Sequence, residues 1–168
     1  VARVLAPTTM AFAPAGRLFV ASQGGEVRVV KDGALLDTPF LRVDVDRQGE
    51  RGLVGLTFDP GFAENGFVYV VYTATTPHLH QRVSRFTAGG DVAIPGEQVI
   101  WEFDRLTNDI HVSGAIAFGP DGKLYVAHGD NGRSGTAQRL DSLFGKVVRL
   151  NPDRTAIHLK LLEIHAKR

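Results

Sequence analysis

The sequence predicts an all-β protein built from four-stranded β-propeller blades, and two observations carry this prediction. Nineteen glycines and eight prolines separate short runs of β-branched and aromatic residues, a pattern typical of many strands joined by tight turns. A motif of the form apolar-x-Phe-x-Pro-x-Gly-x-apolar-aromatic-Val also occurs three times, at a spacing suited to blades with variable loops. The copies cover residues 10–21, 56–70 and 116–127, and the blades are expected at about 5–45, 46–105 and 106–153. The alternative is a β-sandwich whose hairpins resemble one another by chance.

Each copy of the motif is predicted to form a β-hairpin. The first strand ends at the phenylalanine, the proline fixes φ for the turn, and the glycine takes a turn position that disfavours a Cβ. The second copy carries a four-residue insertion around Phe62–Asn65. A further strand with alternating polarity follows each hairpin. These strands are Glu26–Val30, Arg82–Phe86 and Lys146–Leu150.

The C-terminal segment, residues 154–168, differs in composition from residues 1–153. It carries four basic residues and one acidic residue, whereas residues 1–153 carry 15 basic and 17 acidic residues. Its apolar residues fit either a strand, through Ile157, Leu159 and Leu161, or one face of a helix. We expect this basic, apolar tail either to cap an exposed sheet edge or to be the altered end of a truncated gene.

Composition excludes several classes of function. The 168 residues contain 19 Lys and Arg against 18 Asp and Glu, and this balance argues against nucleic acid or an anionic membrane as a partner. The absence of cysteine excludes disulfides and thiolate metal sites. The apolar runs are far shorter than the ~18–20 residues of a membrane span. No complete P-loop, dinucleotide Gly-x-Gly-x-x-Gly, His-Glu-x-x-His or Gly-x-Ser-x-Gly motif supports the enzyme classes that depend on them.

A set of motifs in collinear order points to one family. The set comprises Glu50-Arg51-Gly52-Leu53-Val54-Gly55, Arg82-Val83-Ser84-Arg85-Phe86, His111-Val112-Ser113-Gly114, Gly129-Asp130 and Leu143-Phe144-Gly145-Lys146. Together these motifs resemble the N-terminal half of the glucose/sorbosone dehydrogenase family, over about residues 10–153. The resemblance implies a six-bladed β-propeller that binds pyrroloquinoline quinone (PQQ) with calcium. It also implies oxidation of aldose sugars at the anomeric carbon and a periplasmic or secreted location.

The resemblance assigns roles to three residues. His111 matches the histidine that takes the proton from the sugar hydroxyl while hydride passes to the quinone. Asp130 matches a carboxylate that hydrogen-bonds this histidine. Imidazole suits this role because its unperturbed pKa lies near neutral pH and a carboxylate can fix its tautomer. Glu50 stands where the family's catalytic members place a glutamine that contacts the quinone, so that a carboxylate would face an acidic cofactor here.

The predicted function is therefore that of a PQQ-dependent aldose or alcohol dehydrogenase with a small-molecule sugar as substrate. The alternative is a non-catalytic β-propeller binding module or a self-assembling half-propeller scaffold. The family's cationic quinone ligands and the carbonyl oxygens that hold its calcium belong to later blades. Three blades alone would leave two faces unpacked and sheet edges open. A homodimer or another oligomer is thus expected to complete the ring.

Other candidate residues have plainer interpretations. The acidic run that begins at Asp44 and Asp46 has the rhythm of a calcium loop, but Gly55 stands where an EF-hand needs Glu. His78 and His80 are expected in an exposed loop, and no metal site is predicted. His128 either lines the site or is incidental to it. Trp101 is expected to pack between blades.

Overall fold

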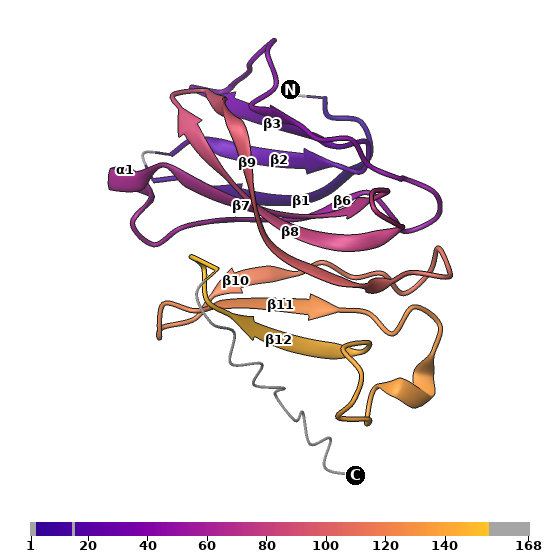
Figure 1. Ribbon diagram of the computed structural model, residues 1–168. Helices are drawn as coiled ribbons and strands as arrows, with labels where there is room; N and C mark the ends of the chain where they lie inside the picture. The colour runs from indigo at the N-terminus through magenta and orange to yellow at the C-terminus, as the bar shows by residue number, and fades with distance from the viewer. Residues whose placement is uncertain (1–2, 15, 155–168) are drawn as a thin grey trace.

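The computed structural model describes residues 3–14 and 16–154 and shows three antiparallel sheets with a single helical turn and one 3-10 turn (Figure 1). The all-β prediction is confirmed. The predictions for the C-terminal segment lie outside the described residues, apart from Arg154. No helix of the described part is long and apolar enough to cross a membrane.

The first sheet has five strands rather than the four expected. Two short strands take the place of a single outer strand. Each pairs with a different end of the same neighbour, β3. The break contains Pro39, which has no N–H to give to a ladder. The strands are β1 (Pro7–Phe12), β2 (Leu18–Ser22), β3 (Glu26–Lys31), β4 (Ala34–Leu35) and β5 (Leu41–Arg42).

The second sheet has the expected four strands in the order β6-β7-β8-β9. The insertion in the second motif forms the single helical turn α1 (Phe62–Asn65), which joins β6 to β7. The strands are β6 (Leu53–Phe58), β7 (Phe67–Ala74), β8 (His80–Gly89) and β9 (Val92–Arg105).

The third sheet has three strands within the described residues, not four. The third blade was expected at about 106–153, and these described residues form three strands. The strands are β10 (Ile116–Phe118), β11 (Leu124–His128) and β12 (Lys146–Leu150), with the 3-10 turn η1 (Ser134–Thr136) between the last two. In all three sheets the repeated motif forms the first hairpin, pairing Phe12 with Leu18, Phe58 with Val68, and Phe118 with Leu124.

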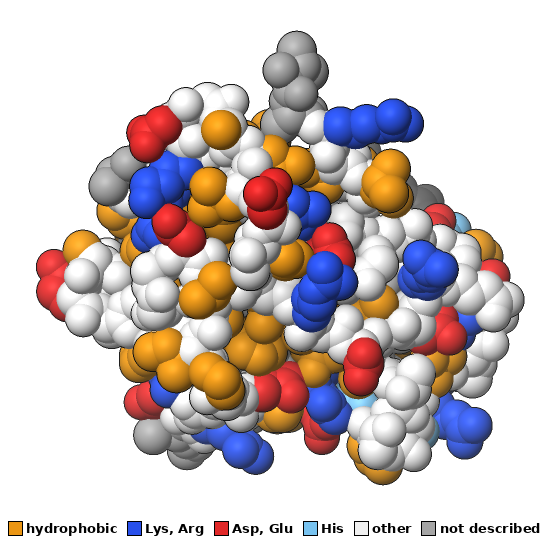
Figure 2. Space-filling view, turned by 90° about the horizontal axis from the view of Figure 1, so that it is seen from above, with side chains coloured by type: hydrophobic (Ala, Val, Ile, Leu, Met, Phe, Trp, Pro, Cys, Tyr) orange, Lys and Arg blue, Asp and Glu red, His pale blue; other side chains and the backbone are white. Residues whose placement is uncertain are grey.

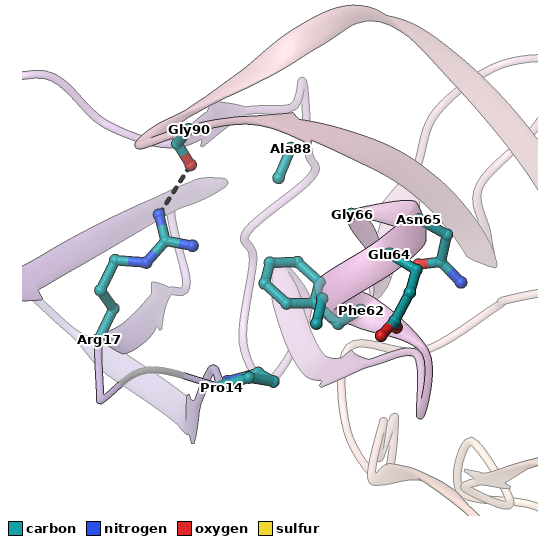
Figure 3. Close-up of a pocket in the computed structure, with 9 residues that line it drawn as sticks. Pro14, Arg17, Phe62, Glu64, Asn65, Gly66, Ala88 and Gly90 are labelled. Carbon is teal, nitrogen blue, oxygen red and sulfur yellow. Dashed lines mark hydrogen bonds between the residues drawn. The ribbon is translucent and has the colours of Figure 1, made fainter.

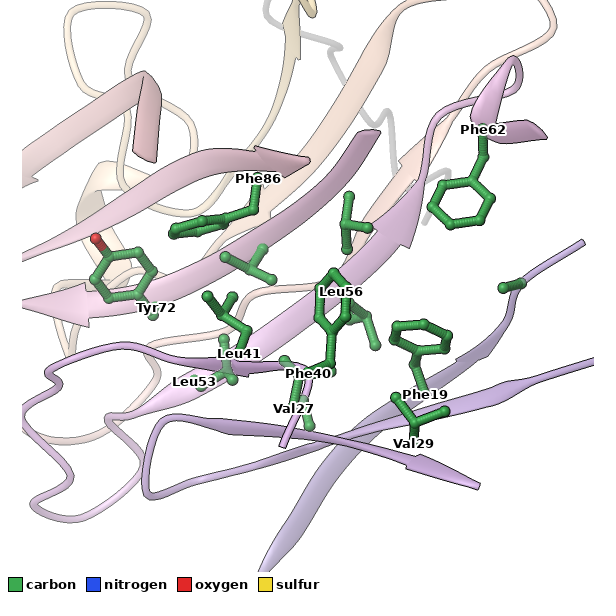
Figure 4. Close-up of a cluster of buried hydrophobic side chains, with 14 of the residues drawn as sticks. Phe19, Val27, Val29, Phe40, Leu41, Leu53, Leu56, Phe62, Tyr72 and Phe86 are labelled. Carbon is green, nitrogen blue, oxygen red and sulfur yellow. The ribbon is translucent and has the colours of Figure 1, made fainter. Parts of the chain in front are cut away.

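Two hydrophobic cores hold the three sheets together, and the second sheet contributes to both. One side of β7 places Val68, Val70 and Tyr72 in the core shared with the first sheet, where Phe19 and Phe40 pack edge to face (Figure 4). The residues between them face the opposite way, toward the third sheet. The second core includes Tyr69, Val71, Val83, Leu124, Val126 and Val148, and Trp101 packs against it, as expected for a residue between sheets. Alternation along β7 therefore places the second sheet between the other two.

The first strands of the three sheets, β1, β6 and β10, lie beside one another. Their approach is close: a Cβ on Gly55 would lie 2.2 Å from the carbonyl oxygen of Gly114. On the other side, Thr8 Oγ1 donates to the Leu53 carbonyl at 2.7 Å. The loops that precede β6 and β10 consequently meet at one end of the molecule, and this end contains Glu50 and His111.

Candidate functional site

His111 and Asp130 form a direct pair. His111 precedes β10, Asp130 follows β11, and the distance from His111 Nδ1 to Asp130 Oδ1 is 2.9 Å. The hydrogen bond from His111, together with one from the backbone N–H of Gly132, lowers the pKa of Asp130. An ionised carboxylate only accepts hydrogen bonds, so Nδ1 of His111 carries the proton and the lone pair lies on Nε2. The His111 side chain is 58% exposed, which makes this lone pair available to a ligand.

The backbone around His111 has an unusual conformation. His111 and Ser113 have φ values of 53° and 54°, in the left-handed region that non-glycine residues rarely adopt. Such residues persist where surrounding contacts over-determine them, and they cluster at functional sites. Two backbone hydrogen bonds hold this segment: Asn131 N donates to the His111 carbonyl at 3.1 Å, and Gly129 N donates to the Val112 carbonyl at 3.3 Å. We call residues 107–113 the His111 loop.

Asn131 anchors the start of the His111 loop, and sequence reasoning missed it. The residue is fully buried and uses every polar atom of its side chain. Its Oδ1 accepts from the backbone N–H groups of Thr107 and Asn108 at 2.8 and 3.0 Å. Its Nδ2 donates to the carbonyls of Asn108 and Ile110. The signal in the sequence was a polar residue next to Asp130 in a Gly-Asp-Asn-Gly turn, which resembles an ordinary turn.

Glu50 lies beside the same loop. Its Oε2 accepts a hydrogen bond from Val112 N at 3.3 Å, and its own backbone N–H donates to the Asp109 carbonyl at 2.8 Å. The structure therefore brings together all three residues that the resemblance singled out. Glu50 contacts the backbone next to His111 and makes no hydrogen bond to the imidazole.

His128 lies behind the site and does not line its exposed surface. The ring is buried, with its centroid 4.1 Å from that of Phe103 and 5.1 Å from that of Phe144. Its Nδ1 contacts Gln81 Oε1 at 2.6 Å, and its Nε2 is buried without a partner in the described structure. Burial lowers the pKa of His128 to about 4, so the ring is neutral near pH 7.

This buried imidazole predicts an acid-sensitive fold. Between about pH 6.5 and pH 4 the unfolded chain protonates His128 whereas the folded protein does not, so the free energy of unfolding is expected to fall by about 3 kcal/mol as the pH decreases through this window. Urea unfolding at several pH values measures the slope. The His128→Phe variant is expected to lose most of this slope, and His78→Phe, at an exposed position, is expected to keep it. Equal slopes in His128→Phe and the unmodified protein would contradict the assignment.

Two further histidines of the described residues differ from each other. His78 is exposed, as expected, but the prediction of an exposed loop is wrong for His80, which is buried as the first residue of β8. His80 occupies an inward-facing position of β8, so its ring is buried. The ring nitrogens of His80 contact the His78 carbonyl at 2.6 Å and Glu102 Oε1 at 3.1 Å. Within the described residues no group of three or more His, Asp or Glu is arranged to hold a metal.

The acidic run before β6 has a structural partner. Asp46 Oδ1 lies 2.9 Å from Nε of the buried Arg51 and accepts from the Gln48 backbone at 3.1 Å. This ion pair closes the loop that carries Glu50.

A cavity of about 410 Å³ lies beside α1, at the opposite end of β6 from Glu50 (Figure 3). Arg17, at its rim, donates to the Gly90 carbonyl at 2.8 Å and pairs with Asp91. The cavity shares no residue with the His111 site, and its arginine is already paired.

Comparisons with known proteins agree with this architecture. The chain is 29% identical to the PQQ-bound aldose sugar dehydrogenase of Streptomyces coelicolor, with a TM-score of 0.79 over 90% of this chain and 46% of that one. It is 30% identical to the aldose sugar dehydrogenase YliI of Escherichia coli, over 86% of this chain and 40% of the relative. It is also 32% identical to mouse Hedgehog-interacting protein, over 82% of this chain and 23% of the relative. The chain thus spans less than half the length of these relatives.

The model of one protein family matches nearly all of the described chain. The match runs from residue 4 to residue 158, and the family is described as Glucose / Sorbosone dehydrogenase. The repeated hairpins, the packing of the three sheets and the similar structures agree with this match. The chain belongs to the glucose/sorbosone dehydrogenase family.

Proposed function

We propose that this chain carries the proton-accepting site of a PQQ-dependent dehydrogenase that oxidises aldoses or related alcohols. The observation that supports it most directly is the 2.9 Å contact between His111 Nδ1 and Asp130 on an exposed histidine. Family membership and the similarity to a PQQ-bound aldose sugar dehydrogenase favour this chemistry over other uses of a His–Asp pair.

The role of the pair follows from its geometry. Asp130 holds the proton on Nδ1, so that Nε2 of His111 can accept the proton of a sugar hydroxyl. The imidazolium that forms is stabilised by the carboxylate at 2.9 Å, and the pair is already oriented before a substrate arrives. The quinone, when bound, would supply the acceptor for the hydride from the anomeric carbon.

The described residues fit the proton transfer but do not by themselves fit an acidic quinone. Within residues 3–14 and 16–154, the hydrogen bonds and ion pairs of His111, Asp130 and Glu50 include no lysine or arginine. The arginines that lie near Glu50 and Asp130 in the sequence have other partners. Arg51 forms an ion pair with Asp46, and Arg133 donates a hydrogen bond to Thr107 Oγ1. Our proposal therefore places the cationic partners of PQQ, and the ligands of its calcium, outside the described residues.

The test is direct. Purified protein supplied with PQQ and Ca²⁺ is expected to show a spectral change on quinone binding and dye-linked oxidation of aldoses. A titration that shows no quinone binding would overturn the proposal.

A second candidate is a non-catalytic propeller that binds another molecule. The carboxylate of Glu50 and the absence of cation contacts to the site within the described part favour it, and so does the similarity to Hedgehog-interacting protein. This candidate predicts a folded protein that binds no quinone, and the same titration distinguishes the two.

We further propose that a second copy of the chain packs against the outer face of the first sheet. Cross-strand pairing places Met10, Phe12, Leu18, Val20 and Val30 on this face, opposite the core-facing residues. Met10 is 66% exposed and Phe12 is 71% exposed. Ala127 and Val147 lie on the outer face of the third sheet, which we propose as the surface that contacts the first sheet of the second copy. Figure 2 shows hydrophobic side chains among charges of both signs on the side of the molecule where the first sheet lies.

Light scattering at micromolar concentration is expected to show a dimer. The Phe12→Glu variant is expected to dissociate it, because a buried unpaired carboxylate opposes association, whereas Val92→Glu, on the β8–β9 hairpin, is expected to leave it intact. A stable monomer of the unmodified protein would exclude the dimer. The periplasmic or secreted location stays a prediction.

A further inference from the structure

We infer that Gln81 is a positioning residue for His111, acting through the backbone carbonyl of Ser113. The inference rests on the proposed function and deepens it, since it concerns how the same base is held in place. Gln81 belongs to β8 of the second sheet, and His111 precedes β10 of the third. The two residues make no direct contact in the described structure, so any effect must pass through the His111 loop.

The contacts of Gln81 join the loop to a buried histidine. Gln81 is fully buried, its Nε2 donates to the Ser113 carbonyl, and its Oε1 lies 2.6 Å from His128 Nδ1. The Ser113 carbonyl can only accept, so the amide nitrogen must face it and the amide oxygen must face His128. His128 in turn must donate from Nδ1.

His128 is itself fixed in place. Its ring lies between Phe103 and Phe144, nearly parallel to both, with interplanar angles of 19° and 29°. Because burial lowers its pKa to about 4, the ring keeps a single proton at neutral pH and gives it to Gln81. The amide therefore has one orientation only, and the position of the Ser113 carbonyl is set by the packing of His128 between Phe103 and Phe144.

The loop needs such support because its conformation is costly. His111 and Ser113 both have left-handed φ values, and each costs of order 1 kcal/mol or more for a residue with a Cβ. Glu50 holds the N–H of Val112 on one side of this turn, and Gln81 holds the carbonyl of Ser113 on the other. Without the second contact, Ser113 can relax to negative φ. The relaxation would displace His111 Nδ1 from Asp130, and a displacement of ~1 Å can cost about 100-fold in rate.

Two variants separate positioning from folding. Gln81→Met keeps the length of the side chain and removes both hydrogen bonds, and Gln81→Leu removes both hydrogen bonds with an apolar side chain of different shape. Gln98→Met is the matched control, because Gln98 lies on β9 of the same sheet and pairs with Arg85, away from the loop. Folding of each variant is checked from the dispersion of its NMR spectrum.

The primary readout is the tautomer of His111, measured from ¹⁵N-coupled imidazole spectra and assigned with the His111→Ala variant. This readout needs neither quinone nor sugar. The unmodified protein and Gln98→Met are expected to show the Nδ1–H form alone. Both Gln81 variants are expected to show a mixture of tautomers. With PQQ, Ca²⁺ and an aldose, kcat is expected to fall about 10- to 100-fold while KM changes by less than about twofold.

The outcomes distinguish this inference from the proposed function. A folded Gln81→Met protein with the Nδ1–H tautomer and unchanged kcat would overturn the positioning role and leave His111 as the base. Full activity in His111→Ala would overturn the proposed function, and the tautomer measurement would still report on Gln81. If Gln81→Met does not fold, Gln81→Leu decides: an unchanged tautomer in that folded variant would show that Gln81 only fills the core.

Discussion

Replacement of His111 by alanine is expected to lower kcat for aldose oxidation by about 10²–10⁴-fold. The variant removes the imidazole that accepts the substrate proton, and positioned general bases contribute effects of this size. Asp130 remains, but its Oδ1 is oriented toward the position of His111 and accepts from the Gly132 N–H, so we expect it not to replace the imidazole. The measurement is a dye-linked assay with PQQ and Ca²⁺ at saturating sugar.

The matched control is His78→Ala. His78 is exposed and lies outside the His111 loop. Its ring packs beside that of His80 at a centroid distance of 5.0 Å, so loss of the ring is expected to leave kcat within about twofold. Quinone binding by His111→Ala is expected to persist, which separates loss of the base from loss of the cofactor. An active His111→Ala enzyme would assign the proton transfer to another group.

A single methyl group at Gly129 is expected to damage both stability and activity. An ideal Cβ on Gly129 would lie 1.8 Å from the carbonyl oxygen of His111 and 2.5 Å from its carbonyl carbon. These atoms are backbone, so the His111 loop must move to admit the methyl group. We expect Gly129→Ala to reduce the free energy of unfolding by about 1–3 kcal/mol and kcat by about 100-fold.

Gly135→Ala provides the control for this variant. Gly135 lies in η1, between β11 and β12, and a Cβ there would meet nothing within 4 Å. Urea unfolding and the dye-linked assay are expected to show no loss for Gly135→Ala. Normal stability and activity in Gly129→Ala would show that the loop tolerates a displacement that the proposed mechanism forbids.

Much of the local architecture follows from residues that are adjacent in sequence. The Phe-x-Pro-x-Gly turns specify hairpins because proline and glycine restrict φ locally, and all three hairpins form where the motif predicts them. The number of strands in each sheet was harder to predict. In the first sheet Pro39 interrupts the outer strand, an effect that depends on which edge the segment joins.

The histidines likewise show which features the sequence predicts and which depend on tertiary packing. Motif similarity pointed to His111 and Asp130, and the structure places them in contact. The sequence around His80 and His128 indicated nothing about burial, because neither lies in a strongly alternating run. Their environments come from neighbouring segments. Glu102 of β9 lies next to His80, and His128 is enclosed between Phe103 of β9 and Phe144 of the turn before β12.

By itself, the sequence determined the all-β class, the hairpins and the identity of the His–Asp pair, since each depends on short-range patterns or on motifs in collinear order. Only the tertiary structure decided how that pair is held. The left-handed turn at His111 and Ser113 is supported by Glu50 from the loop before β6, Gln81 from β8 and Asn131 from the turn after β11. These segments are far apart in sequence and meet because the sheets pack through shared cores, so no local pattern could have revealed their contacts.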